Sequence, residues 1–232
     1  MNKVNLPRHQ LLFLSLLFAV LFSSSNGWAF GVCGFDDFPM MDDMKTSTLL
    51  DSSIHNNRPL MVRSFIIDVE FVEVQTFYHE LWEGRVDHST YGPWRQITTI
   101  TDKCMMTVQV ASKELGGSHG RLVISNLPGA AANQALGLDL IRPGDSQVIS
   151  DLKTDDGFKT GRVSVLTSAQ SPSQLKQFYA NEYINDGWTF EREFSEGAGT
   201  VIVFRRGVET ANVLFLEGAT GTQILINQED LD

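Results

Sequence analysis

The chain has 232 residues, with 28 acidic residues against 18 basic ones and a formal net charge of −10 at pH 7. A surface with this excess of negative charge repels nucleic acid and anionic lipid, so we expect neither as a binding partner. Hydrophobic residues make up 42% of the chain and aromatic residues 10%, which is typical of a globular protein rather than a disordered one.

The N-terminus has the layout of a cleavable signal peptide. Lys3 and Arg8 precede an apolar run over 11–22, and the small residues Gly27 and Ala29 flank Trp28 just before a cleavage point after Ala29. The run is too short for a membrane-spanning helix, which needs about 20 apolar residues. We therefore predict that 1–29 is removed and that the mature protein is exported, periplasmic or secreted, with no membrane span.

Two cysteines, Cys33 and Cys104, are the only ones in the chain. In an oxidising compartment we expect them to form a disulfide, and closing a loop of about 70 residues would stabilise the fold by about 4 kcal/mol. Two free thiols are one alternative. Another is a lipoprotein signal acylated at Cys33, which is disfavoured because the branched Val32 precedes that cysteine where a small residue is required. A catalytic cysteine is the least favoured alternative, because neither cysteine lies in a nucleophile motif.

An internal repeat with an offset of 101 residues follows, because Phe77 and Tyr78 recur as Phe178 and Tyr179. In the first copy, the pattern predicts a strand over 61–67, a helix over 72–82, a strand opening at Trp94, and strands over 96–100, 105–110 and 121–125. Val74, Phe77, Tyr78 and Leu81 form an apolar stripe at helical spacing, which favours a helix packed on a sheet.

The second copy repeats this order more clearly. Its predicted elements are a strand over 162–167, a helix over 171–185, a chain re-entry over 186–188, and strands over 200–204, 212–216 and 223–226. Ser171 is a typical N-cap, and Pro172 suits the first helical position because it needs no hydrogen-bond donor there. On this pattern the first copy has one strand fewer, or a shorter hairpin, than the second.

These patterns predict an α+β protein made of two tandem copies of a two-layer unit, each an antiparallel sheet with one helix packed on one face. The predicted boundaries are 30–126 for the first copy with its N-terminal tail, 127–138 for a Pro/Gly-punctuated linker, and 139–232 for the second copy. The residues expected to mark the two cores are Phe77, Tyr78, Trp94, Phe178, Tyr179 and Trp188.

The motif Ser-Pro-Ser-x-Leu-x-x-Phe-Tyr over 171–179, followed by Asn-Asp-Gly-Trp over 185–188, resembles small α+β domains of uncharacterised bacterial envelope proteins. Some of those proteins are encoded near pilus or secretion machinery. The resemblance covers the second copy well and the first copy only through Phe77, Tyr78 and 92–94. It implies a place in the cell envelope and no catalytic residue.

No residue pattern in the sequence indicates a catalytic, cofactor or metal site. The histidines beyond the signal are His55, His79, His88 and His119, and their spacings match no metal-ligand motif. The acidic pairs at 36–37 and 42–43 lack the alternating ligands of a calcium loop and suggest a solvated, flexible leader. The run 116–120 suggests a hairpin turn rather than a nucleophile motif.

Duplication without a catalytic signature suits binding through surfaces. We therefore predict a non-enzymatic, periplasmic accessory or adaptor protein of an envelope, pilus or secretion assembly, which binds a protein partner through exposed sheet edges and needs no cofactor. The alternative is a periplasmic carrier or sensor that holds a small apolar ligand between a helix and a sheet or between the two copies.

Overall fold

The computed structural model describes residues 33–129 and 133–231. The predicted signal peptide and its cleavage point lie outside the described residues. Among the residues that are described, no helix is both long enough and apolar enough to cross a membrane.

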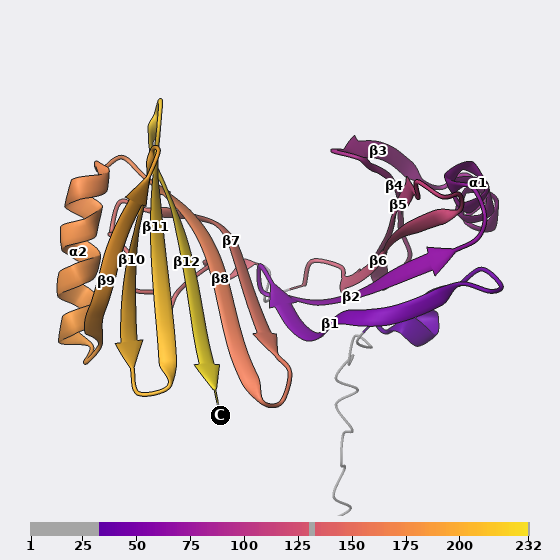
Figure 1. Ribbon diagram of the computed structural model, residues 1–232. Coiled ribbons are helices and arrows are strands. Elements are labelled where there is room, and N and C mark those ends of the chain that lie inside the picture. Colours follow the sequence, from indigo (N-terminus) through magenta and orange to yellow (C-terminus); the bar gives the residue numbers. More distant parts are fainter. Residues whose placement is uncertain (1–32, 130–132, 232) are drawn as a thin grey trace, which may run out of the picture. The chain divides into compact units, whose positions relative to one another are not determined.

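Each copy of the repeat follows the order ββαββββ (Figure 1). The first copy consists of the 3-10 helix η1 (Phe35–Asp37), β1 (Lys45–His55), β2 (Arg58–Ile67), α1 (Phe71–Leu81), β3 (Asp87–Tyr91), β4 (Trp94–Ile100), β5 (Cys104–Ser112) and β6 (Ser118–Asn126). The second copy consists of β7 (Gln147–Asp155), β8 (Lys159–Ser168), α2 (Pro172–Asn185), β9 (Thr189–Glu196), β10 (Gly199–Arg206), β11 (Glu209–Gly218) and β12 (Gly221–Leu231). Both copies therefore have six strands, so the expectation of one strand fewer in the first copy is wrong. The alternative of a shorter hairpin is confirmed, because β3 and β4 have 5 and 7 residues and their counterparts β9 and β10 have 8 each.

One antiparallel sheet contains all twelve strands, in the order β3-β4-β5-β6-β2-β1-β7-β8-β12-β11-β10-β9. The two copies are joined where β1 pairs with β7, and Ser53 lies opposite Thr154 in that pairing. These two residues are also equivalent at the 101-residue offset. The junction thus pairs two copies of the same edge about a local pseudo-twofold axis, as in an isologous dimer.

The prediction of an α+β protein made of two tandem two-layer units, each with its own antiparallel sheet, is therefore wrong, because the chain is predominantly one antiparallel sheet with two helices. The error arises at β1 and β7, which were not predicted. Most residues of β1 are exposed, and two register shifts interrupt its pairing with β2. Such a strand carries no alternation of apolar and polar residues that the sequence could reveal.

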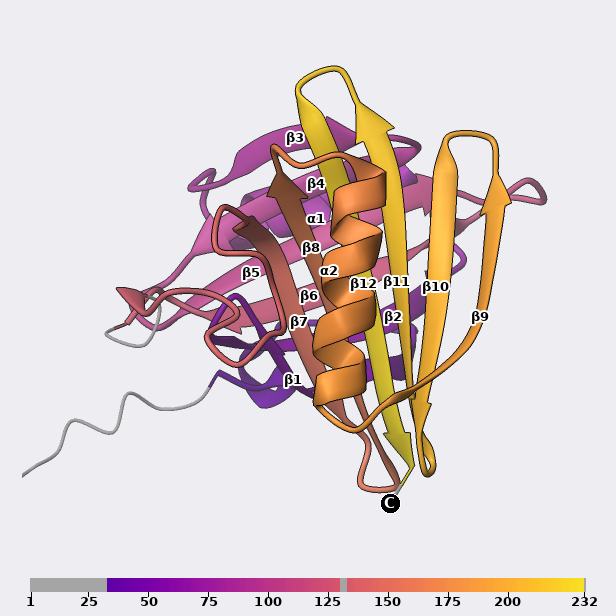
Figure 2. The ribbon, with the colours of Figure 1, turned by 90° about the vertical axis from the view of Figure 1, so that its left-hand side faces the viewer.

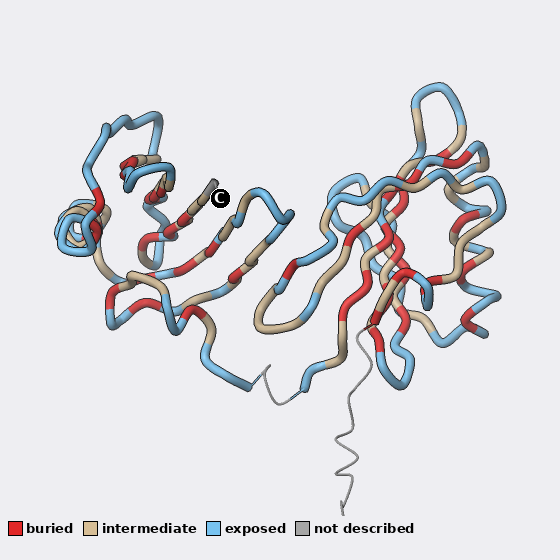
Figure 3. Tube along the Cα trace, turned by 90° about the horizontal axis from the view of Figure 1, so that it is seen from below, coloured by how far each residue is buried: buried red, intermediate tan, exposed pale blue. Residues whose placement is uncertain are grey.

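Both helices bury an aromatic stripe against strands of their own repeat. In α1 the fully buried residues are Val74 and Tyr78, and in α2 they include Leu175 and Tyr179, all with 0% exposure. Figure 2 shows α2 lying along one face of the strands of the second repeat. Buried residues gather along the strands, whereas the hairpin tips are exposed (Figure 3).

A shared hydrogen bond fixes the chain just before each helix. The Ser118 hydroxyl donates to the carbonyl of Val69 at 2.7 Å, and the Thr222 hydroxyl donates to the carbonyl of Gln170 at the same distance. Val69 and Gln170 are separated by the 101-residue offset. The duplication therefore extends from the order of elements to individual side-chain contacts.

The N-terminal segment of the first repeat is packed against its core. The disulfide joins Cys33 to Cys104 with 5.8 Å between the Cα atoms, so the predicted pairing is confirmed. Phe35 and Phe38 are 8% and 4% exposed, and the Tyr78 hydroxyl donates to the carbonyl of Pro39 at 3.0 Å. The four carboxylates of the predicted leader over 36–43 are exposed, as a solvated segment requires. The segment is nevertheless packed on the core through Phe38 rather than forming a free leader.

Candidate functional site

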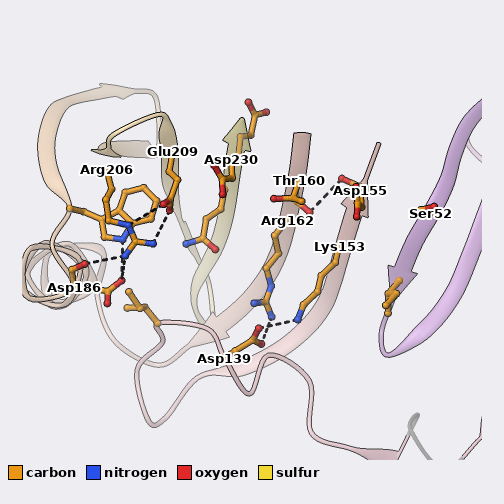
Figure 4. Close-up of a pocket in the computed structure, with 17 residues that line it drawn as sticks. Ser52, Asp139, Lys153, Asp155, Thr160, Arg162, Asp186, Arg206, Glu209 and Asp230 are labelled. Atoms are coloured by element: carbon orange, nitrogen blue, oxygen red, sulfur yellow. Dashed lines mark hydrogen bonds and ion pairs between the residues drawn. The ribbon is translucent and has the colours of Figure 1, made fainter. Parts of the chain in front are cut away.

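A charged cleft of about 510 Å³ opens mainly in the second repeat, beyond the C-terminal end of α2 (Figure 4). Strands β7, β8 and β12 form its floor, and the α2–β9 turn and the β10–β11 hairpin form one wall. Ser52 and Ile54 of β1, in the first repeat, also line it. Its charged lining residues are Asp139, Lys153, Asp155, Arg162, Asp186, Arg206, Glu209, Glu229 and Asp230.

Arg162 is the centre of an ion-pair network on the floor. Its Nε and Nη2 atoms donate to the two carboxylate oxygens of Asp151, both at 2.8 Å, and Nη2 also donates to Asp139 at 2.9 Å. The Ser164 hydroxyl donates to Asp151, and Lys153 donates to Asp139. Bidentate pairs of this kind are among the stronger charge-assisted hydrogen bonds.

The register of two strands places these groups on one face of the sheet. In the pairing of β7 with β8, Lys153 lies opposite Arg162, and Asp151 lies opposite Ser164. Directly opposed residues in an antiparallel pair point to the same side, and so do residues two apart along a strand. Four polar side chains from two neighbouring strands therefore meet at the floor of the cleft.

The network keeps its carboxylates ionised. Partial burial disfavours the charged form of Asp139, but hydrogen bonds from Arg162 and Lys153 outweigh burial and lower its pKa to about 2. Burial likewise opposes ionisation of Asp151, and hydrogen bonds from Arg162 and Ser164 lower its pKa below the usual value. A carboxylate with a lowered pKa is a poor proton donor or acceptor near neutral pH, which favours binding over acid–base chemistry at this floor.

Arg206 builds the opposite wall by stacking its guanidinium over the ring of Trp188, 4.6 Å from the ring centroid. The same guanidinium binds Glu209 through two nitrogens, at 2.8 Å and 3.3 Å, and Asp186 at 3.0 Å. The Trp188 indole N–H in turn donates to Asp186 at 3.1 Å. These contacts hold the side chains of this wall in place and neutralise the positive charge of Arg206.

Six carboxylates line the cleft against three cationic groups, and each cation is paired with a carboxylate. Glu229 is paired with Lys159 outside the cleft. Two carboxylates, Asp155 and Asp230, make no ion pair with any described residue. The cleft therefore presents excess negative charge to whatever enters it.

Four of the six aromatic landmarks, Phe77, Tyr78, Phe178 and Tyr179, occupy matched places in the two repeats, whereas Trp94 begins β4 and Trp188 precedes β9, the counterpart of β3. Tyr78 and Tyr179 are fully buried, Trp188 is 5% exposed, and Phe77 and Phe178 are partly buried against the same cores. Trp94 is the exception because it lies outside the first core, with His119 at its edge and Arg121 over its face. Of the predicted landmarks, Trp188 alone lines the cleft.

Two of the four histidines that sequence spacing left unconnected lie side by side. The Nδ1 atom of His79, in α1, is 3.4 Å from the Nε2 atom of His88, in β3. His55 contacts the Ser150 hydroxyl at 3.0 Å, and His119 packs against Trp94. Gly116 and Gly117 lie in the β5–β6 turn with positive φ, as a hairpin turn requires.

Sequence reasoning missed the residues of the cleft floor. A weak signal existed in Asp151 and Lys153, whose spacing of two places both on one face if the segment is a strand. The signal can be read only if 147–155 is a strand, and the sequence pattern predicts no strand there.

Comparison of the chain with known protein families, curated proteins and solved structures gave no match.

Proposed function

We propose that this chain is a non-enzymatic, exported accessory protein of an envelope, pilus or secretion assembly, and that the cleft of its second repeat binds a basic segment of a partner protein. The observation that carries this proposal is the charge balance of the cleft. Its cations are all neutralised, and Asp155 and Asp230 remain to attract lysine or arginine side chains.

Export is supported by the disulfide between Cys33 and Cys104, because such bonds persist in oxidising compartments and are rare in the cytosol. The periplasm as the compartment, the signal peptide and the envelope partner belong to the proposal. The acidic net charge of the chain agrees with a cationic partner and opposes nucleic acid or anionic lipid.

The packing supports a protein-binding role over the alternative role of a carrier for a small apolar ligand. Side chains fill the space between α2 and its strands, where Leu175, Tyr179 and Phe215 have 0% exposure. Thirteen of the seventeen residues that line the cleft are charged or polar, whereas typical small-molecule sites are lined predominantly by hydrophobic and aromatic side chains.

Site-specific cross-linking in a cell that exports the protein tests this proposal. A photo-cross-linking residue at Thr160 lies in the cleft, and one at Val163 lies on the opposite face of the same strand and serves as the matched control. We expect a protein adduct at Thr160 that weakens in the double variant Asp155→Asn/Asp230→Asn. Two outcomes would contradict the proposal: adducts at Val163 alone, or adducts at Thr160 whose yield is unchanged in the double variant.

Salt provides a second readout of the same interaction. Exposed charges are largely screened once the Debye length falls from about 10 Å at 0.1 M salt to about 3 Å at 1 M salt. We therefore expect a Lys-rich peptide to bind the purified chain at low salt and to dissociate at high salt. A Glu-rich peptide of equal length serves as the control and is expected not to bind.

A further inference from the structure

We propose that His79 and His88 form a binding site for a divalent zinc-type metal ion, held by Nδ1 of His79 and Nε2 of His88. Zinc–nitrogen bonds of about 2.0–2.1 Å at a tetrahedral angle place the two ligating nitrogens about 3.4 Å apart. The two facing nitrogens of this pair are separated by 3.4 Å. The pair therefore has the spacing that such an ion requires without any movement of the backbone.

The two ligands come from different elements that the fold holds in place. His79 lies in the last turn of α1, beside the buried Tyr78, and His88 lies in β3 opposite the buried Ile97 of β4. Each imidazole thus extends from a backbone that packing or strand pairing fixes. Pre-positioned ligands lose little conformational freedom when an ion binds.

Both imidazoles are exposed, so an ion can reach them from solvent. No cluster of three or more metal-ligating side chains occurs among the residues that the structure describes. The site therefore supplies two ligands and leaves the remaining coordination positions to water. Imidazole nitrogen favours zinc, copper and nickel, whereas magnesium and calcium prefer oxygen ligands.

The fold does not require this histidine pair. At the 101-residue offset, the second repeat has Ala180 in place of His79 and Thr189 in place of His88. The helix and strand of that repeat form without either imidazole. The pair is thus a feature of the first repeat alone.

An ion bound there would link α1 to β3, which is one outer edge of the sheet. Every residue of β3 is exposed, and its described strand pairing is with β4 alone. A strand that is paired on one side only is less protected from hydrogen exchange than the central strands of a sheet. We therefore expect metal binding to slow hydrogen exchange of the β3 amides.

Zinc titration of the purified chain, made without a histidine tag, tests the site by calorimetry at about pH 7.5, where free imidazole is neutral. We expect one equivalent of Zn²⁺ to bind, Cu²⁺ to bind more tightly, and Mg²⁺ not to bind. The variants His79→Gln and His88→Gln should each lose that equivalent. Glutamine keeps a polar side chain on the surface, so both variants should retain the circular dichroism spectrum of the parent chain.

The variants His55→Gln and His119→Gln are the matched controls, and we expect them to bind one equivalent like the parent chain. Failure of the parent chain to bind Zn²⁺ would overturn the proposal and leave the 3.4 Å contact as a hydrogen bond between two imidazoles. Binding that survives both His79→Gln and His88→Gln would also overturn it. In that case the ion would be held by other groups.

Discussion

The two repeats share one order of elements, yet equivalent positions are apolar and packed on the core in the first repeat and charged in the second. In the first repeat, the N-terminal segment places Phe38 in the core, and Met61 packs against that core. At the 101-residue offset the second repeat has Asp139 and Arg162, which pair at 2.9 Å in the cleft. One scaffold thus carries a closed apolar contact in one copy and an open charged cleft in the other, so the two copies diverge in side chains rather than in topology.

Removal of the disulfide should have the largest effect, and it should act on the first repeat. Cys33 lies at the start of the packed segment, and the bond to Cys104 closes a loop of 71 residues. We expect Cys33→Ser/Cys104→Ser to lower the free energy of unfolding by about 4 kcal/mol. Urea denaturation followed by tryptophan fluorescence measures this loss. A change below about 1 kcal/mol would mean that aromatic packing alone holds the segment.

How far the sequence predicts this fold depends on how each element is buried. The predicted strands 61–67 and 162–167 lie within β2 and β8, and both helices lie within one residue of their predicted ends. These elements bury apolar residues at a regular period, which the sequence displays directly. All residues of β3 and β9 are exposed, so those outer strands carry no such period.

The cleft was harder to predict than the fold because its residues meet through strand register. Asp151 and Arg162 come together only after β7 pairs with β8, and β7 has one buried residue, Asp151 itself. The apolar residues of this segment, Val148, Ile149 and Leu152, show no regular alternation, so the sequence does not indicate a strand there. The disulfide was predictable because the chain offers one possible pair of cysteines.

Exchange of cleft residues for their counterparts in the first repeat should reveal how strongly the network is coupled. Asp151 has a side chain only 4% exposed, and that of Arg162 is 13% exposed. Removing one partner of a buried pair leaves an uncompensated charge, so we expect Arg162→Met to lower stability by about 3 kcal/mol. Chemical denaturation measures the change.

The double variant Asp151→Leu/Arg162→Met places the first-repeat residues at both positions. Replacing both ions by apolar groups is often neutral, so we expect the double variant to be more stable than Arg162→Met alone. Strictly additive losses would show that the two side chains are not coupled, and the comparison of the repeats would lose its energetic basis.

The matched tyrosines Tyr78 and Tyr179 provide a smaller test. The Tyr78 hydroxyl donates to Pro39, whereas the buried Tyr179 hydroxyl has no hydrogen-bond partner among the described residues. We expect Tyr78→Phe to cost about 1 kcal/mol, because it leaves a carbonyl without its donor, and Tyr179→Phe to cost nothing or to stabilise. Thermal denaturation of the two variants side by side measures the difference. Equal losses would indicate that the two hydroxyls have equivalent environments.

The smallest expected effect is a dependence of stability on pH that belongs to the cleft. Because folding lowers the pKa of Asp139 from 3.8 to about 2, its ion pairs stabilise the protein above about pH 4 and are lost as the pH falls through about 2. The Asp139 side chain is 62% exposed, so solvent screening limits this contribution to about 1 kcal/mol or less. Urea denaturation between about pH 5 and pH 2 should therefore show a shallower fall for Asp139→Asn than for the parent chain. The first repeat has Phe38 at this position and can make no such contribution, so equal slopes would remove this distinction between the repeats.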